Sequence, residues 1–91
     1  MIKRGEVNFN FYTDEYFSEK EITVKGLTPS NFISVVTLPE SNLDHDLDDF
    51  LVEQVTTGIK KINKDSITLV ATAPESASGI YKFNYIITYA Y

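Results

Sequence analysis

The last thirteen residues of the chain, 79–91, constrain the fold more than any other stretch because their side chains alternate in character. In a β-strand, successive side chains point to opposite faces of the sheet, so residues two apart share a face. One face of this segment is apolar or aromatic throughout: Tyr81, Phe83, Tyr85, Ile87, Tyr89 and Tyr91. Five of the twelve aromatic residues, six Tyr and six Phe, lie on that face, and we expect the core to be built against it.

Other segments show the same two-residue period between turns rich in Gly, Pro and Asn. Residues 6–12 alternate cleanly, with Val7, Phe9 and Phe11 on one side. Further strands are predicted at 21–25, 32–38 and 66–73, whereas 13–20 and 74–79 are typical of loops. The strand at 32–38 is almost continuously apolar, which predicts a central strand covered on both faces. Six or seven short, evenly spaced strands predict an all-β fold, a small antiparallel β-sandwich of the Ig-like or Greek-key type.

Residues 40–55 carry two competing patterns. Apolar residues recur there at three- and four-residue spacing, as in a helix: Leu43, Leu47, Phe50, Leu51 and Val55. The Asp residues between them are poor interior helix formers, and β-branched residues become frequent after Leu51. We predict a short helical turn near residues 46–51 and a strand from about residue 52, and helix versus strand stays open across 42–55.

At 91 residues the chain is long enough for one domain, 1–91, with one modest core. Folding at this size removes roughly 60–65% of the accessible surface from water, so a partner subunit often adds to the stability of such a chain. We therefore expect a homo-oligomer or repeated copies. The chain has no Cys, which excludes disulfides and thiolate metal sites, and no cofactor is expected.

The charge balance excludes some partners. Thirteen acidic and eight basic residues give a net charge of −5, which argues against nucleic-acid binding because that needs clustered Lys and Arg. No apolar run approaches the roughly 20 residues that cross a bilayer, so no membrane partner is expected. Residues 1–6 carry charges without an apolar stretch behind them, so we expect no signal peptide and production in the cytoplasm.

Acidic side chains cluster between residues 40 and 53, where no basic residue occurs. Five of them offer oxygen ligands that suit Ca²⁺: Asp44, Asp46, Asp48, Asp49 and Glu53. If Asp44 is the first position of a calcium loop, the sixth is Asp49 instead of Gly and the twelfth is Val55 instead of Glu. The favoured interpretation is a solvated acidic turn whose carboxylates cap backbone N–H groups, with a cation site as the alternative.

His45 is the only histidine of the chain. A zinc site built on one His without Cys needs several carboxylates. A catalytic triad needs a positioned nucleophile, and no motif in the sequence indicates one. We therefore expect no enzyme activity. The predicted role of His45 is that of a surface turn residue, hydrogen-bonded to a neighbouring Asp.

Two groups of residues are candidates for partner binding. The tyrosines offer apolar area with a polar tip, which suits a sugar-stacking platform or a protein interface; Tyr89 and Tyr91, at the end of the chain, are the members that core packing explains least simply. The basic cluster Lys60, Lys61 and Lys64 could meet the acidic turn of a neighbouring copy. Core packing for the tyrosines and solvated surface for the charges remain the alternatives.

Four short stretches follow one another in a definite order: T-V-K-G-L-T at 23–28, D-H-D-L-D-D at 44–49 with V-E at 52–53, I-T-L-V-A-T-A-P at 67–74, and G-I-Y-K-F-N-Y at 79–85. In this order they resemble small β-sandwich virion proteins of tailed bacteriophages, across roughly residues 22–85. Lys25 stands where that group more often has Pro. The resemblance implies a structural virion component and brings no catalytic motif with it.

We therefore expect a non-catalytic structural component of a tailed-phage virion, such as a capsid decoration, head or tail fibre, or tail-tip protein. It would act through contacts with virion proteins after synthesis in the host cytoplasm. Two alternatives stay open. One is a carbohydrate-binding module for host attachment at a surface glycan, against which the absence of Trp counts mildly; the other is a small acidic inhibitor of a host protein, for which a net charge of −5 is modest.

Overall fold

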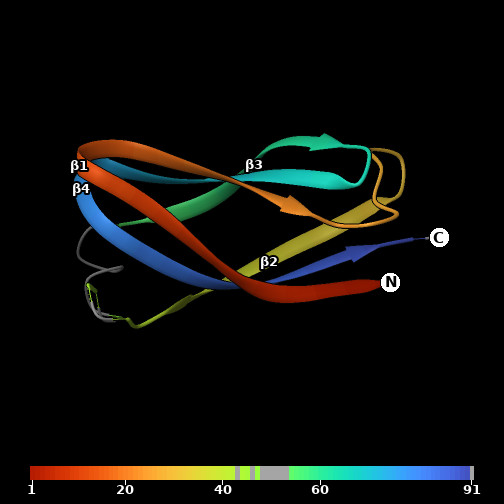
Figure 1. Cartoon of the computed structure of the whole chain (residues 1–91), viewed down its shortest axis with the longest axis horizontal. Coiled ribbons are helices and arrows are strands. Elements are labelled where there is room, and N and C mark those ends of the chain that lie inside the picture. The colour runs from red at the N-terminus through yellow and green to blue at the C-terminus, as the bar shows by residue number, and fades with distance from the viewer. Residues whose placement is uncertain (43, 46, 48–53, 91) are drawn as a thin grey trace.

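The computed structural model describes residues 1–42, 44, 45, 47 and 54–90. Its four strands are β1 (Ile2–Thr23), β2 (Phe32–Glu40), β3 (Thr56–Asn63) and β4 (Ser66–Tyr89). All of them belong to one antiparallel sheet, in which β4 pairs with each of the other three (Figure 1). The predicted all-β, antiparallel class is confirmed.

Strand β4 is too long to remain straight within this molecule. Its 24 residues would extend about 80 Å at about 3.3 Å per residue, whereas the longest dimension of the protein is 38 Å. Odd-numbered side chains are nevertheless buried along almost all of β4, from Ile67 to Tyr89. The strand therefore folds over with the same face inward, and β1 runs beside it and folds back at the same end of the molecule (Figure 1).

The fold divides the sheet into two halves that face each other. The β2 half consists of residues 2–11 of β1, residues 79–89 of β4, and β2. The β3 half consists of residues 17–23 of β1, residues 66–73 of β4, and β3. An Ig-like or Greek-key sandwich of separate sheets is not confirmed, because β1 and β4 pass continuously from one half into the other.

The core lies between the two halves. Its largest fully buried side chains come from both of them and from the segment that follows β1: Tyr81, Phe9, Phe11, Leu27, Ile67, Leu69, Ile87 and Val24. Two edge-to-face ring pairs join β1 to β4, Phe9 with Phe83 at 5.7 Å and Phe11 with Tyr81 at 5.2 Å between centroids. The prediction that the core is built on the odd-numbered face of residues 81–89 is confirmed.

The bend of β1 replaces the loop predicted at 13–20. The ladder to β4 shifts register between Phe11 and Glu15 and again between Glu15 and Phe17, and the buried side chains change from odd to even numbers, as at Ile22. Asp14 adopts a positive φ of 50° within this bend. The prediction of loops at 13–20 and 74–79 is wrong, because both segments stay within the strands β1 and β4.

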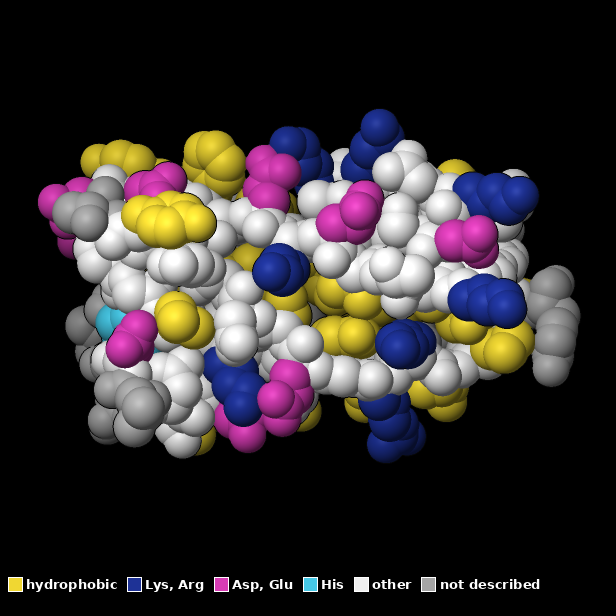
Figure 2. Space-filling view, in the orientation of Figure 1, with side chains coloured by type: hydrophobic (Ala, Val, Ile, Leu, Met, Phe, Trp, Pro, Cys, Tyr) yellow, Lys and Arg dark blue, Asp and Glu magenta, His cyan; other side chains and the backbone are white. Residues whose placement is uncertain are grey.

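Hydrophobic and acidic side chains gather at the surface of the end where β1 and β4 fold back (Figure 2). The bend itself exposes three aromatic side chains, Tyr12, Tyr16 and Phe17. The helical turn predicted near 46–51 lies outside the described residues, apart from Leu47, and the strand expected from about residue 52 is described from Thr56. Within the described ranges, no helix is long and apolar enough to span a membrane.

Candidate interaction surface

The outer face of the β2 half is an ordered surface that spans three strands. Its side chains stand in rows across three strands, because antiparallel register places residues directly opposite one another. Reading β1, β4 and β2 in turn, the rows are Arg4, Ile86 and Val36; Glu6, Asn84 and Leu38; Asn8, Lys82 and Glu40. The row at one end of this face holds the charged side chains of Lys82 and Glu40, and toward the other end Ile86, Val36 and Leu38 form an apolar patch on β4 and β2 that is bordered by Arg4 and Glu6 of β1.

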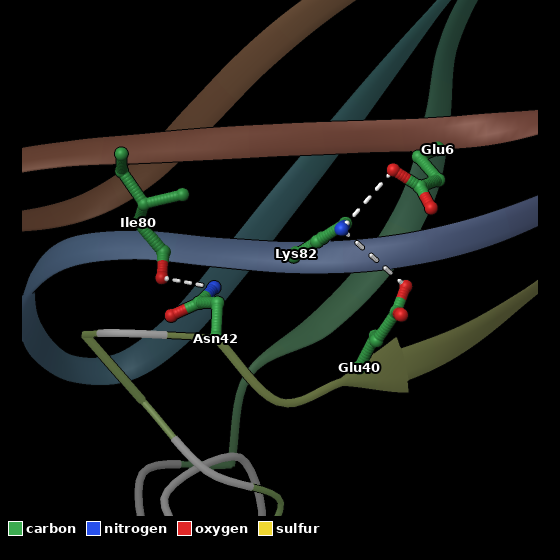
Figure 3. A network of polar contacts seen from close by, with 5 residues as sticks. All are labelled: Glu6, Glu40, Asn42, Ile80 and Lys82. Carbon is green, nitrogen blue, oxygen red and sulfur yellow. Dashed lines mark hydrogen bonds and ion pairs between the residues drawn. The ribbon is translucent and has the colours of Figure 1, made fainter.

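The charged end is an ion-pair network centred on Lys82. Its Nζ lies 3.1 Å from Glu6 Oε2 and 3.8 Å from Glu40 Oε2, so one ammonium on the central strand joins both neighbouring strands (Figure 3). The hydrogen bond to Glu6 is the largest cause that raises the pKa of Lys82 above its ordinary 10.5. Partial burial opposes this rise, and the attraction of the Glu40 carboxylate adds to it.

Glu6→Gln is expected to lower the pKa of Lys82, because the neutral amide removes the strongest interaction that favours the ammonium. A pKa raised by folding means that the folded state binds this proton more tightly than the unfolded state. The stabilisation is therefore complete below pH 10.5 and is lost as the pH rises through the folded-state pKa. An NMR titration of the Lys82 side chain measures the change, with Glu21→Gln in the β3 half as the control; equal pKa values in all three proteins would contradict the network.

The chain segment after β2 docks on β4 through a docking loop that consists of Asn42, Asp44 and His45. Asn42 Oδ1 accepts hydrogen bonds from the N–H groups of Asp44 at 2.8 Å and His45 at 2.9 Å, which closes a compact turn. The Asn42 side-chain amide donates to Ile80 O at 3.0 Å (Figure 3). Asp44 Oδ2 in turn accepts the Ile80 N–H at 2.8 Å, so this loop pairs both backbone groups of Ile80.

His45 completes this docking. Its ring stacks on Tyr81, with 3.9 Å between centroids and 16° between planes, and its Nε2 lies 2.7 Å from Ser78 O. The residue Gly79 lies directly beneath: a Cβ there would stand 3.0 Å from His45 Nε2 and 3.1 Å from Asp44 Oδ2. The contacts of Asp44 and His45 hold the loop on the sheet, which is a structural role.

The predicted cation site is only partly within the described structure. Asp44 caps a backbone N–H, as the acidic-turn interpretation predicts, while Asp46, Asp48, Asp49 and Glu53 lie outside the described residues. Among the residues that the structure does describe, no group of three or more His, Asp or Glu side chains is arranged to hold a metal ion.

The apolar end of the outer face belongs to strand β2, which is an edge strand. Within the described part of the chain, β2 pairs with β4 alone. Three of its apolar side chains are more than half exposed, Ile33 at 60%, Val36 at 51% and Leu38 at 59%. The sequence interpretation of a central strand covered on both faces is therefore wrong. Pro39 is the signal that could have corrected it, because Pro lacks the N–H that a central strand donates.

The middle of the β2 edge lacks the charged side chains that commonly protect an edge strand against pairing with another chain. Natural edge strands are commonly blunted by charged side chains, by Pro or by bulges, whereas residues 32–38 contain no charge. A register shift between Phe32 and Ser34 and the Pro at 39 limit the regular free edge to the residues between them. On the inner side of this stretch, Thr37 Oγ1 lies 2.6 Å from Thr57 Oγ1 of β3.

The residues predicted to bind partners occupy three different settings. Tyr89 is 5% exposed and its hydroxyl donates to Lys25 O at 3.0 Å, so it packs in the core, while Tyr91 lies outside the described residues. Lys60 Nζ pairs with Glu19 Oε1 of the same chain at 2.6 Å. Lys61 and Lys64 are exposed. Partner binding by these residues stays a prediction.

Comparison with known proteins adds no relative: no protein-family model, curated protein or solved structure matches this chain significantly. The resemblance to phage virion proteins therefore stays a prediction, and the geometry of the surface carries the functional argument.

Proposed function

We propose that this chain is a non-catalytic assembly protein that binds other proteins through the free edge of β2. The observation that carries the proposal is the exposure of Val36 and Leu38 on a stretch of the edge strand, residues 32–38, that contains no charge. A strand added at this edge would pair the backbone N–H and C=O groups that point away from β4. It would also cover the side chains of Val36 and Leu38, which are more than half exposed to water in the single chain.

The charged network beside this edge gives the proposed contact an orientation. The ion-pair network lies at one end of β2, where Glu40 pairs with Lys82. A partner strand laid along β2 would therefore contact Val36 and Leu38 along its length and charged groups at the Glu40 end. Charges at the rim of an interface contribute more to orientation and association rate than to affinity. The arrangement of an apolar centre with a polar border is typical of protein interfaces.

The setting we propose is the virion of a tailed phage, assembled in the host cytoplasm. In that setting the chain would serve in repeated copies as a decoration, fibre or tail-tip component, bound to capsid or tail proteins. The sequence resemblance supports this setting, and the free edge supports the mode of contact. His45 and Asp44 fit a non-catalytic protein, since both hold the docking loop on β4.

Leu38→Lys is expected to weaken association at least about tenfold, because a charge placed on the free edge must be desolvated in the contact. Sedimentation velocity of the purified protein measures self-association, and co-purification with phage particles measures binding to virion proteins. The control is Ile59→Lys, which introduces the same charge at a 41% exposed apolar residue of β3. Thermal unfolding shows that both variants fold.

The proposal is overturned if the wild-type chain stays monomeric over a wide concentration range and does not co-purify with particles. Equal association of the two Lys variants would place the contact elsewhere on the molecule.

A further inference from the structure

A hollow of about 290 Å³ lies against the bend of β1. The bend brings residues from its two sides to one place: Asn8, Asn10 and Tyr12 precede it, and Phe17 and Lys20 follow it. Asn8, Asn10 and Tyr12 stand on one face of the strand because they are two residues apart. The hollow is therefore a product of the fold, since an unbent β1 would hold these two groups far apart.

The aromatic walls of the hollow are exposed to an unusual degree. Tyr12 is 77% exposed and Phe17 is 55% exposed, although the core holds many smaller apolar side chains at under 10%. Large apolar groups left in water at one place commonly mark a binding surface. Tyr12 faces outward because its neighbour Phe11 is fully buried on the other face of β1.

The backbone of the bend that carries Tyr12 is held by hydrogen bonds before any ligand arrives. The Tyr12 N–H donates to Glu15 Oε1 at 3.0 Å, which closes the bend locally. The Asp14 N–H donates to Ser78 Oγ at 3.0 Å, which ties the bend to β4. A preorganised site avoids much of the entropy cost of ordering its side chains and loops on binding.

A second hollow of about 310 Å³ adjoins the first, and the two share Asn8. Its other lining residues are Asn42, Asp44, Ile80 and Lys82. The amide groups of Asn8 and Asn10 make no hydrogen bond within the described part of the chain, so both are available to a ligand. An Asn amide offers donors and an acceptor together, which matches a hydroxyl group that also does both.

We propose that the two adjoining hollows bind an oligosaccharide. Tyr12 and Phe17 would cover the flat apolar faces of sugar rings, and Asn8 and Asn10 would hydrogen-bond to ring hydroxyls. Two hollows of about 290 and 310 Å³ that share Asn8 offer room for more than one sugar ring. Most of this site lies on β1, away from the edge of β2, although Lys82 lines the second hollow and also belongs to the ion-pair network beside that edge.

The charges that line the two hollows favour an oligosaccharide over a nucleic acid. The lining of the first hollow carries Glu15 and Glu19 beside Lys20, and that of the second carries Asp44 beside Lys82. A single-stranded nucleic acid needs a positively charged groove beside its stacking platforms, which this mixture of signs does not provide. A hydroxyl-rich ligand with little charge needs no such field.

The test is an array of bacterial and animal oligosaccharides probed with the full chain, followed by calorimetric titration with the oligosaccharide that binds best. Tyr12→Ala and Phe17→Ala are expected to weaken that binding at least tenfold, and Asn10→Ala at least threefold. Tyr16→Ala is the matched control, because Tyr16 is a 61% exposed aromatic residue of the same bend that does not line the hollow. Its effect is expected to stay below twofold.

Thermal unfolding of each variant shows that the bend remains intact. An array on which no oligosaccharide binds overturns the proposal and leaves a protein contact as the explanation of the exposed aromatics. Binding that the Tyr12→Ala and Phe17→Ala variants retain at wild-type strength overturns it as well.

Discussion

Phe11→Ala is expected to lower the free energy of unfolding by about 3–5 kcal/mol, the range for removing a fully buried aromatic side chain. Phe11 is 0% exposed and its ring lies edge-to-face on Tyr81, so truncation leaves a cavity between the two halves of the sheet. The whole stability of a domain of this size is about 5–15 kcal/mol. A large share of the molecules would therefore be unfolded at moderate temperature.

Tyr12→Ala is the control for this prediction, because it removes a ring of nearly the same size one residue along β1. Tyr12 is 77% exposed, and surface substitutions usually change stability by less than about 0.5 kcal/mol. Urea unfolding followed by circular dichroism measures both values. Similar losses in the two variants would show that β1 does not present Phe11 inward and Tyr12 outward, and would contradict the register described above.

Gly79→Ala is expected to destabilise the protein by about 1–3 kcal/mol for two reasons that act together. Gly79 has φ = +93°, a conformation that L-residues with a side chain rarely adopt. The new methyl group would also stand 3.0 Å from His45 Nε2 and 3.1 Å from Asp44 Oδ2, closer than ordinary contact. The docking loop would have to move away from β4.

Hydrogen exchange separates the movement of the loop from general destabilisation. The Ile80 N–H donates to Asp44 Oδ2, so its exchange should accelerate more than that of amides in the β3 half. Gly58→Ala is the matched control: its φ is not positive, and the new Cβ would lie 4.0 Å from Val70 Cγ1. That variant is expected to stay within about 1 kcal/mol of wild type. An unchanged Ile80 exchange rate in Gly79→Ala would show that the loop does not depend on this glycine.

The two proposed surfaces of this sheet suit two different kinds of ligand. Among the described residues, β4 is the only strand that pairs with β2, so the far edge of β2 beside Val36 and Leu38 suits another polypeptide. The bend of β1 offers Tyr12 and Phe17 beside amide side chains, which suits a hydroxyl-rich ligand. The central strand β4 belongs to both, since Lys82 lies beside each surface.

Part of the candidate surface could be predicted from the sequence and part could not. The alternation at 81–89 predicts which side chains are buried, because a strand turns successive residues to opposite faces whatever its neighbours are. That Asp44 caps a backbone N–H agrees with the general preference of Asp in turns, but the N–H belongs to Ile80, 36 residues along the chain, which no local pattern identifies. The ion pairs of Lys82 do not follow from local pattern, because Glu6 and Glu40 lie far from it in the chain.

The sequence by itself therefore determined the all-β class, the inward faces of β1 and β4, and the aromatic residues on which the core is built. The tertiary structure alone decided that residues 13–20 and 74–79 continue as strand, that β2 lies at an edge, and that Tyr89 is buried. Side-chain periodicity is a local property of the backbone and is visible along the chain. Strand order and the position of a bend depend on hydrogen bonds between segments far apart in sequence, and these form only when β1 and β4 fold over together around their common core.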